Sequence, residues 1–197
     1  MFAVYAKEAN LNNPLASVVV GERPAPVVPE GWVRVRVTHA SLNRHDIFTL
    51  CGVTAQKQPI PFPMILGNDG AGLLDDGTPV AIYPLIGSDN WQGDETLDPA
   101  WHVFSELVPG TMADYVAVPR RNAIPLPEGL SPLNAGLLGT AWLTARGVAV
   151  TELAAERAML GPAVGIRMRR VIFHCAFAHA FVWTTRCRAG HSGSPLS

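Results

Sequence analysis

Apolar and polar side chains alternate along several stretches of the first 120 residues, and this alternation predicts β-strands. In the segment 31–38, one face of the predicted strand carries Val33, Val35 and Val37, and the other carries Arg34 and Arg36. The runs 71–74 and 79–83 flank the turn sequence Asp-Asp-Gly-Thr at 75–78, so we expect a hairpin there. A further alternating stretch, residues 111–118, stops at Pro119.

Helical patterns come late in the chain. Prolines interrupt the earlier runs, and they disfavour long helices because proline lacks an N–H donor and clashes with the preceding turn. Residues 131–145 predict a helix with Ser131 as its N-cap and Pro132 in the first helical position. A second helix is expected over 151–160. The fold class is therefore mainly β with a few helices, a small twisted barrel or sandwich with long loops.

The composition narrows the classes of partner. The chain has 197 residues and a net charge of −1, which fits one domain or one domain with an appendage and disfavours nucleic acid as a partner. The longest apolar run, 171–183, contains two histidines and is shorter than the roughly 20 residues that cross a bilayer, so we expect no membrane span. Three cysteines without a CxxC pair and a start without a leader pattern predict a cytoplasmic protein.

Five segments occur in an order that resembles the medium-chain dehydrogenase/reductase superfamily, most closely its quinone-oxidoreductase-like and zinc-type alcohol dehydrogenase-like members. These are GWVRVRV at 31–37, ASLNRHD at 40–46, PMILGNDGAG at 63–72, GTMADYVAV at 110–118 and LPEGLS at 126–131. The resemblance covers about residues 1–144. It implies a GroES-like catalytic domain, a partly open β-barrel over 1–130, that complete members join to a Rossmann domain binding NADP(H) or NAD(H).

The last 53 residues do not continue this resemblance. The segment 131–145 corresponds to the start of a linker helix, but 146–197 contains no glycine-rich GxGxxG turn. Residues 1–144 carry a net charge of −6, whereas 145–197 carries +5, with no Lys and no Asp. We expect 146–197 to be an atypical tail, helical and poorly defined, that is frameshifted or disordered, with a genuine divergent segment as the alternative. No tight cofactor binding is expected, and the exposed helix 131–145 invites homo-oligomers or other association.

The residues at the zinc-ligand positions of the family disfavour zinc. Zinc-dependent members carry Cys where this chain has Asn43 and His where it has Asn68, and neutral amides are poor zinc ligands. The segment 86–106 also lacks the cysteines of the structural zinc lobe. We therefore expect no bound zinc.

The loop 43–46 holds three candidate catalytic residues. The resemblance implies that Asn43 faces the nicotinamide end of the cleft and that Asp46 helps to hold the loop; the alternative is a strand-to-helix turn in which both only cap backbone N–H groups. His45 stands where zinc-dependent members relay protons, and imidazole suits this chemistry because it titrates near neutral pH. The alternative is an exposed loop histidine.

Two further positions follow from the resemblance. Thr140 corresponds to a threonine that contacts the nicotinamide ribose or amide, although Gly139 replaces the family's proline and is expected to loosen the helix entrance; a plain helix-surface threonine is the alternative. The glycines at 67, 70 and 72 are interpreted as backbone requirements of a barrel corner, with Asp69 as a structural neighbour of the site.

Two classes of function remain open at this point. The first is the catalytic domain of an NAD(P)H-dependent oxidoreductase that reduces a small-molecule quinone, enone or carbonyl, inactive without its cofactor domain. The second is a non-enzymatic GroES-like binding module or the remnant of a pseudogene.

Overall fold

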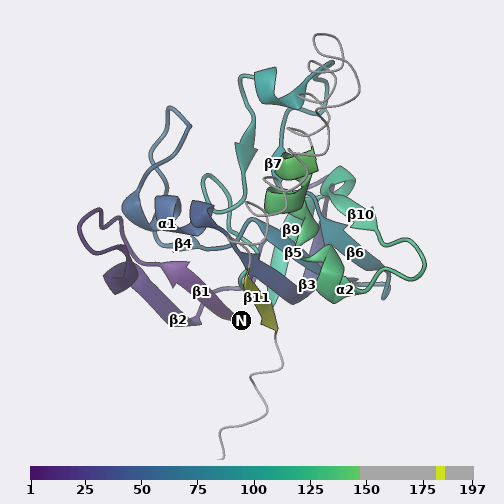
Figure 1. Ribbon diagram of the computed structural model, residues 1–197, viewed down its shortest axis with the longest axis horizontal. Helices are drawn as coiled ribbons and strands as arrows, with labels where there is room; N and C mark the ends of the chain where they lie inside the picture. Colours follow the sequence, from purple (N-terminus) through teal and green to yellow (C-terminus); the bar gives the residue numbers. More distant parts are fainter. Residues whose placement is uncertain (147–180, 185–197) are drawn as a thin grey trace, which may run out of the picture.

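Strand β3 (Trp32–Leu42) organises the larger sheet of the molecule. The computed structural model describes residues 1–146 and 181–184. One edge of β3 pairs antiparallel with β5 (Asp69–Leu74), and the other pairs with β9 (Tyr115–Pro119) and, nearer the end of β3, with β11 (Phe181–Thr184). Beyond β5 the sheet continues through β6 (Pro79–Ile82) to β10 (Ala123–Pro125) (Figure 1).

Smaller elements complete the barrel. A three-stranded sheet has the order β2 (Val18–Glu22), β1 (Phe2–Ala6), β4 (Met64–Ile65), and β7 (Leu85–Ile86) pairs with β8 (His102–Val103). The helical elements are short: η1 (Pro14–Ser17), α1 (Arg44–Cys51), η2 (Glu95–Leu97), η3 (Arg120–Asn122), α2 (Pro132–Ala135) and the π-helix η4 (Leu138–Trp142). Among the described residues, no helix has the length and hydropathy needed to span a bilayer.

The strand predictions are largely confirmed. Val33, Val35 and Val37 are buried, and the turn at 75–78 joins β5 to β6 as a hairpin. Strand β3 extends beyond the predicted 31–38 to Leu42, with a bulge after Val37 that continues its pairing with β5. In the predicted strand 111–118 only the part from Tyr115 is a strand, because residues 111 and 112 donate their N–H groups to the loop carbonyls of residues 67 and 66.

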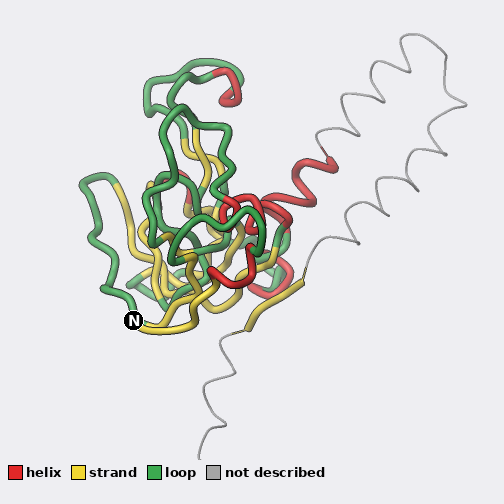
Figure 2. Tube along the Cα trace, turned by 90° about the vertical axis from the view of Figure 1, so that its left-hand side faces the viewer, coloured by secondary structure: helices red, strands yellow, loops and turns green. Residues whose placement is uncertain are grey.

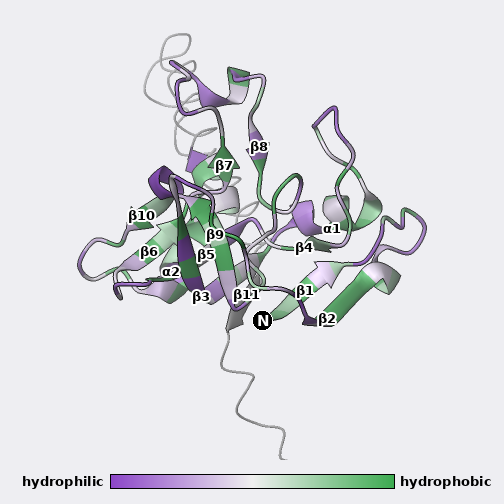
Figure 3. Ribbon diagram, turned by 180° about the vertical axis from the view of Figure 1, so that it is seen from behind, coloured by the Kyte–Doolittle hydropathy of each residue, from purple (hydrophilic) through white to green (hydrophobic). Residues whose placement is uncertain are grey.

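The core lies between these strands and α1. Its fully buried side chains include Val35, Leu50, Val80, Phe104 and Val116. Burial of each such side chain stabilises the fold by about 1.5–3 kcal/mol. Figure 3 shows that hydrophobic residues are concentrated on the strands, whereas the connecting loops are more hydrophilic. The barrel core therefore needs only residues from the first 120 or so positions.

The helix predicted over 131–145 is confirmed in part, because the segment is helical but interrupted. Ser131 caps α2 by accepting a hydrogen bond from the Asn134 N–H at 3.3 Å, and Pro132 is the first helical residue, as expected. Helix α2 ends at Ala135, however, and the π-helix η4 begins at Leu138. Figure 2 shows the helical segments in red among the strands and loops. Gly139 in this π-helix packs so closely that a Cβ would lie 2.5 Å from Asp69 Oδ1, so it serves close packing and does not loosen the segment.

This C-terminal helical segment exposes apolar side chains, as the sequence predicts. The exposed ones are Leu133, Leu138, Trp142 and Leu143, whereas Leu137 is half-buried and was expected to be exposed. The expected helix over 151–160 lies outside the described residues, as does most of the expected tail 146–197. Within that tail, residues 181–184 form strand β11, so the helical expectation is wrong for these four residues.

Candidate functional site

The junction between β3 and α1 positions the first group of candidate residues. Asn43 is the N-cap of α1, and the Asp46 carboxylate accepts its backbone N–H at 2.7 Å in a capping box. The other Asp46 oxygen accepts the N–H of Gly67 at 2.8 Å. Gly67 has a φ of +98°, a conformation that favours glycine. Asp46 therefore ties the start of α1 to the chain that follows β4.

Asp46 is only 3% exposed, and this environment changes its acidity. Burial raises the pKa of Asp46 to about 6, although the N–H groups of Asn43 and Gly67 and the charge of His45 act in the opposite direction. Both carboxylate oxygens already accept backbone hydrogen bonds. Its geometry is that of a buried structural carboxylate.

Asp69, the first residue of β5, accepts hydrogen bonds from polar groups in two parts of the chain. One carboxylate oxygen accepts hydrogen bonds from Ser41 Oγ and Asn43 Nδ2, both at 3.0 Å. The other accepts the hydroxyl of Thr140 at 2.5 Å. Burial raises the pKa of Asp69 above its ordinary value. The hydrogen bonds from Thr140, Asn43 and Ser41 act in the opposite direction but do not outweigh burial. Two candidate residues that are distant in sequence, Asn43 and Thr140, therefore meet on one buried carboxylate.

These contacts decide between the structural alternatives for three residues. The capping interpretation holds for Asp46 and, through the capping box, for Asn43, but capping is not the whole role of Asn43, because its amide nitrogen also donates to Asp69 and Ser41. Thr140 is not a plain surface threonine, because its hydroxyl binds Asp69. The interpretation of Asp69 as a structural neighbour of the site matches its position. What Asn43 and Thr140 contact on a bound cofactor stays a prediction.

His45 lies in the first turn of α1, so its interpretation as an exposed loop histidine is wrong. Its side chain is 21% exposed, and Nε2 lies 3.1 Å from Oε1 of Glu106, whose side chain is 3% exposed. Glu106, which is 61 positions further along the chain, is not among the site residues predicted from the sequence. One signal was available: Glu106 is the only charged residue between Asp98 and Asp114.

The donor atoms at the family's zinc positions do not fit zinc. Asn68 is buried, and its Nδ2 donates to the carbonyl of Phe104 at 2.7 Å. The Asn43 amide nitrogen donates to Asp69, and amides are poor zinc ligands in any case. Among the residues that the structure describes, no group of three or more His, Cys, Asp or Glu side chains is arranged to hold a metal ion. The absence of bound zinc itself stays a prediction.

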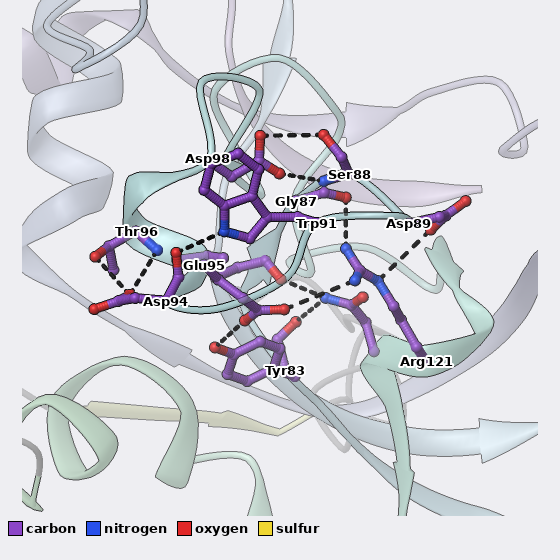
Figure 4. Close-up of polar contacts among 12 residues, drawn as sticks. Tyr83, Gly87, Ser88, Asp89, Trp91, Asp94, Glu95, Thr96, Asp98 and Arg121 are labelled. Carbon is purple, nitrogen blue, oxygen red and sulfur yellow. Dashed lines mark hydrogen bonds and ion pairs between the residues drawn. The ribbon is translucent and has the colours of Figure 1, made fainter.

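Polar contacts hold together the segment 86–106, which lacks the cysteines of the family's structural zinc lobe. The Asp98 carboxylate accepts hydrogen bonds from the N–H and hydroxyl of Ser88 (Figure 4). It also accepts the N–H of Ala100. The guanidinium of Arg121 donates to the Gly87 carbonyl and pairs with Glu95 at 3.7 Å. These contacts connect residues 88 and 98–100 and join this segment to Arg121.

A phenol on β6's C-terminal side joins the same network. The Tyr83 hydroxyl donates to Glu95 at 2.8 Å, as Figure 4 shows. Burial, together with this hydrogen bond and the nearby Glu95 charge, raises the pKa of Tyr83 to about 12. The phenol therefore stays protonated at neutral pH and acts as a hydrogen-bond donor.

Comparison with known proteins identifies the domain. The family model of the alcohol dehydrogenase GroES-like domain matches residues 29–128, a little over half of the chain. No curated protein matches.

Solved structures match a longer part of the chain. An NAD-dependent alcohol dehydrogenase is 30% identical, with a TM-score of 0.70, and the match covers 78% of this chain and 48% of that one. The quinone oxidoreductase from Thermus thermophilus, solved also with NADPH, is 26% identical with a TM-score of 0.55, covering 79% of this chain and 42% of its own. A thermostable alcohol dehydrogenase from Pyrobaculum aerophilum, 22% identical, shares the fold with a TM-score of 0.66, covering 77% of this chain and 47% of its own. The chain thus spans about half the length of these structures.

Proposed function

The chain belongs to the alcohol dehydrogenase GroES-like domain family, and on this premise we propose that residues 1–130 are the substrate-side catalytic domain of an NAD(P)H-dependent oxidoreductase. The proposed substrate is a small quinone, enone or other carbonyl compound. The proposed location is the cytoplasm, and nucleic acid and membranes are not proposed as partners.

The observation that carries this proposal is the shared carboxylate of Asp69. It holds the amide of Asn43 and the hydroxyl of Thr140 in one place, at the start of the helix that carries His45. A catalytic domain needs its polar groups fixed in advance, because a preorganised site does not have to reorganise during the reaction. A module that only binds a partner would not require this convergence.

The proposed roles follow from this arrangement. Asn43 and Thr140 fit the nicotinamide end of the cofactor, because both are polar, lie on one carboxylate and come from different parts of the chain. The bound reduced nicotinamide would supply a hydride. His45 would supply the proton that accompanies reduction of the substrate, and Asp46 would hold the turn that presents His45.

The rest of the cofactor needs more than the described residues supply. The sequence after residue 145 contains no GxGxxG turn to bind a pyrophosphate at a helix N-terminus. We therefore propose that residues 1–197 alone are inactive as a reductase. The exposed apolar side chains of residues 133–143 would associate with a further domain or with a second copy.

A chimera tests the proposed function. Residues 1–146 would be joined to the nucleotide-binding part of the Thermus thermophilus quinone oxidoreductase, and NADPH oxidation would be followed with a quinone, an enone and an aldehyde. We expect turnover with at least one of them, and His45→Ala should lower the turnover number about 10²-fold, the size expected for loss of a general acid. His102→Ala, which changes a half-buried histidine in β8, is the matched control. A folded chimera that binds NADPH but reduces none of the three would favour the non-enzymatic binding module.

A further inference from the structure

Helix α1 presents two side chains to a single turn of the chain. His45 and Thr49 are four positions apart and therefore lie on the same face of α1. Thr49 Oγ1 donates to the Ser105 carbonyl at 3.0 Å, and His45 Nε2 lies 3.1 Å from Glu106. The turn 104–106 is thus attached to α1 at two successive points, and one of them is the candidate proton donor.

The backbone of this turn is unusual. Ser105 has a φ of +67°, a value that residues other than glycine adopt only rarely, and it is fully buried. Its N–H donates to the Val108 carbonyl at 2.9 Å, and its hydroxyl lies 3.2 Å from Thr49 Oγ1. Such backbone conformations persist where the surroundings impose them, often at functional sites. In this turn Phe104 is buried in the core, and Glu106, two residues further on, contacts His45.

The environment of Glu106 keeps it ionised. Burial acts to raise its pKa, but the hydrogen bond and positive charge of His45, with contributions from Thr54 and Ala55, outweigh burial and lower the pKa of Glu106. A carboxylate only accepts hydrogen bonds, so the imidazole nitrogen that faces it must carry a proton. The proton on Nε2 is therefore held by Glu106.

This contact leaves the second imidazole nitrogen available. Nδ1 of His45 is buried and has no hydrogen-bond partner among the described residues. A buried polar atom without a partner is uncommon in folded proteins and points to a role that the free chain does not fill. The edge of the imidazole ring also packs against Phe48, with the ring centroids 6.4 Å apart, which further restricts its orientation.

We propose that Glu106 is the positioning residue for His45, holding Nε2–H so that Nδ1 handles the proton at the candidate site. The proton-transfer part of this inference rests on the proposed function. In the reduction, the Nδ1–H bond of the imidazolium would break and an O–H bond would form on the substrate oxygen, while the reduced nicotinamide delivers the hydride. The imidazole would be left neutral, with Nε2–H still donating to Glu106. Asp46 in the same helical turn is the other carboxylate affected by the His45 charge.

The pairing is testable by NMR on the full chain, without cofactor. With ¹⁵N-labelled histidine, we expect a downfield, slowly exchanging proton resonance on Nε2 of His45 in the wild type. It should be lost in Glu106→Met, which removes the acceptor at similar side-chain size, while the amide spectrum stays dispersed. Gln at position 106 can still accept this hydrogen bond, so Glu106→Gln should retain part of the signal. The matched control is Glu95→Gln, because this carboxylate belongs to the network of Tyr83.

A second measurement follows the titration of Glu106, the other member of the pair. In wild type and in His45→Gln, the side-chain carboxyl carbon of Glu106 would be titrated by ¹³C NMR. Because the His45 charge lowers the pKa of Glu106, we expect the titration midpoint to move to higher pH in the variant. An unchanged midpoint, or an Nε2 proton that persists in Glu106→Met, would overturn the proposal. If both signatures are present but the chimera reduces no substrate, the pairing stands and the proposed reductase function fails.

Discussion

The buried carboxylate of Asp46 gives a quantitative prediction for the pH dependence of stability. It is 3% exposed, and burial raises its pKa from 3.8 to about 6. In the unfolded chain the same group loses its proton near pH 4. Between these two values the folded state binds a proton that the unfolded state has already released. The free energy of unfolding therefore falls as the pH rises from about 4 to about 6.

The size of this effect follows from the two pKa values. They differ by about 2 units, and each unit corresponds to roughly 1.4 kcal/mol, so the contribution of Asp46 changes by about 3 kcal/mol across the window. The contribution is fully present below pH 4 and is lost above pH 6. Asp46→Asn keeps the side-chain shape but cannot titrate, and so it removes this dependence.

The assay is urea denaturation of the full chain, wild type and Asp46→Asn, at half-unit steps from pH 4 to pH 7. Because Asp69 and Glu106 titrate in both proteins, most of their contribution cancels in the difference. We expect the stability of the variant relative to wild type to increase by about 3 kcal/mol over this range. Asp89→Asn removes an equal charge at a side chain that is 90% exposed and is the matched control. A difference that stays constant from pH 4 to pH 7 would refute the reasoning.

Three other predictions concern packing, metal and cofactor. Gly139→Ala would place a Cβ 2.5 Å from Asp69 Oδ1 and should destabilise the fold by about 1–3 kcal/mol in urea denaturation; Gly21→Ala, which meets open space, should change stability by less than about 0.5 kcal/mol. Elemental mass spectrometry should find no stoichiometric zinc, because Asn43 and Asn68 supply amides, and one tightly held zinc per chain would contradict this. Calorimetry should detect no micromolar NADPH binding to residues 1–197, and limited proteolysis should leave a fragment of about residues 1–125; a resistant fragment reaching residue 197 would contradict the second expectation.

Local patterns account for the parts of the fold that the sequence predicts well. The alternating valines of 31–38 and the turn at 75–78 depend on neighbouring residues, so a short stretch is enough to predict β3 and the β5–β6 hairpin. The N-cap at Ser131 is equally local. The break after Ala135 was missed, and the segment that follows it makes contacts that are distant in sequence: Gly139 packs against Asp69, which is on β5.

In the candidate site, too, contacts between residues that are distant in sequence could not be predicted. The resemblance selected Asn43, His45, Asp46 and Thr140, and the structure brings Asn43 and Thr140 together on Asp69. It gave no reason to select Glu106, because the contact with His45 spans 61 positions and depends on the turn at Ser105. A left-handed conformation at a serine has no marker in the sequence comparable to glycine. Contacts of this kind can be identified only from a three-dimensional structure.

Four carboxylates are buried among the described residues, and the three at the candidate site, Asp46, Asp69 and Glu106, differ in their hydrogen-bond partners. This difference supports the proposed proton chemistry. Asp46 accepts two backbone N–H groups and Asp69 accepts amide and hydroxyl donors, so these hydrogen bonds connect neither carboxylate to an imidazole. Burial raises the pKa of both. Glu106 instead meets an imidazole, and its pKa is lowered. Carboxylates whose pKa values are shifted in opposite directions commonly have different roles in one site. Asp46 and Asp69 therefore hold the candidate site together, and under the proposed function His45 would transfer the proton while Glu106 positions it.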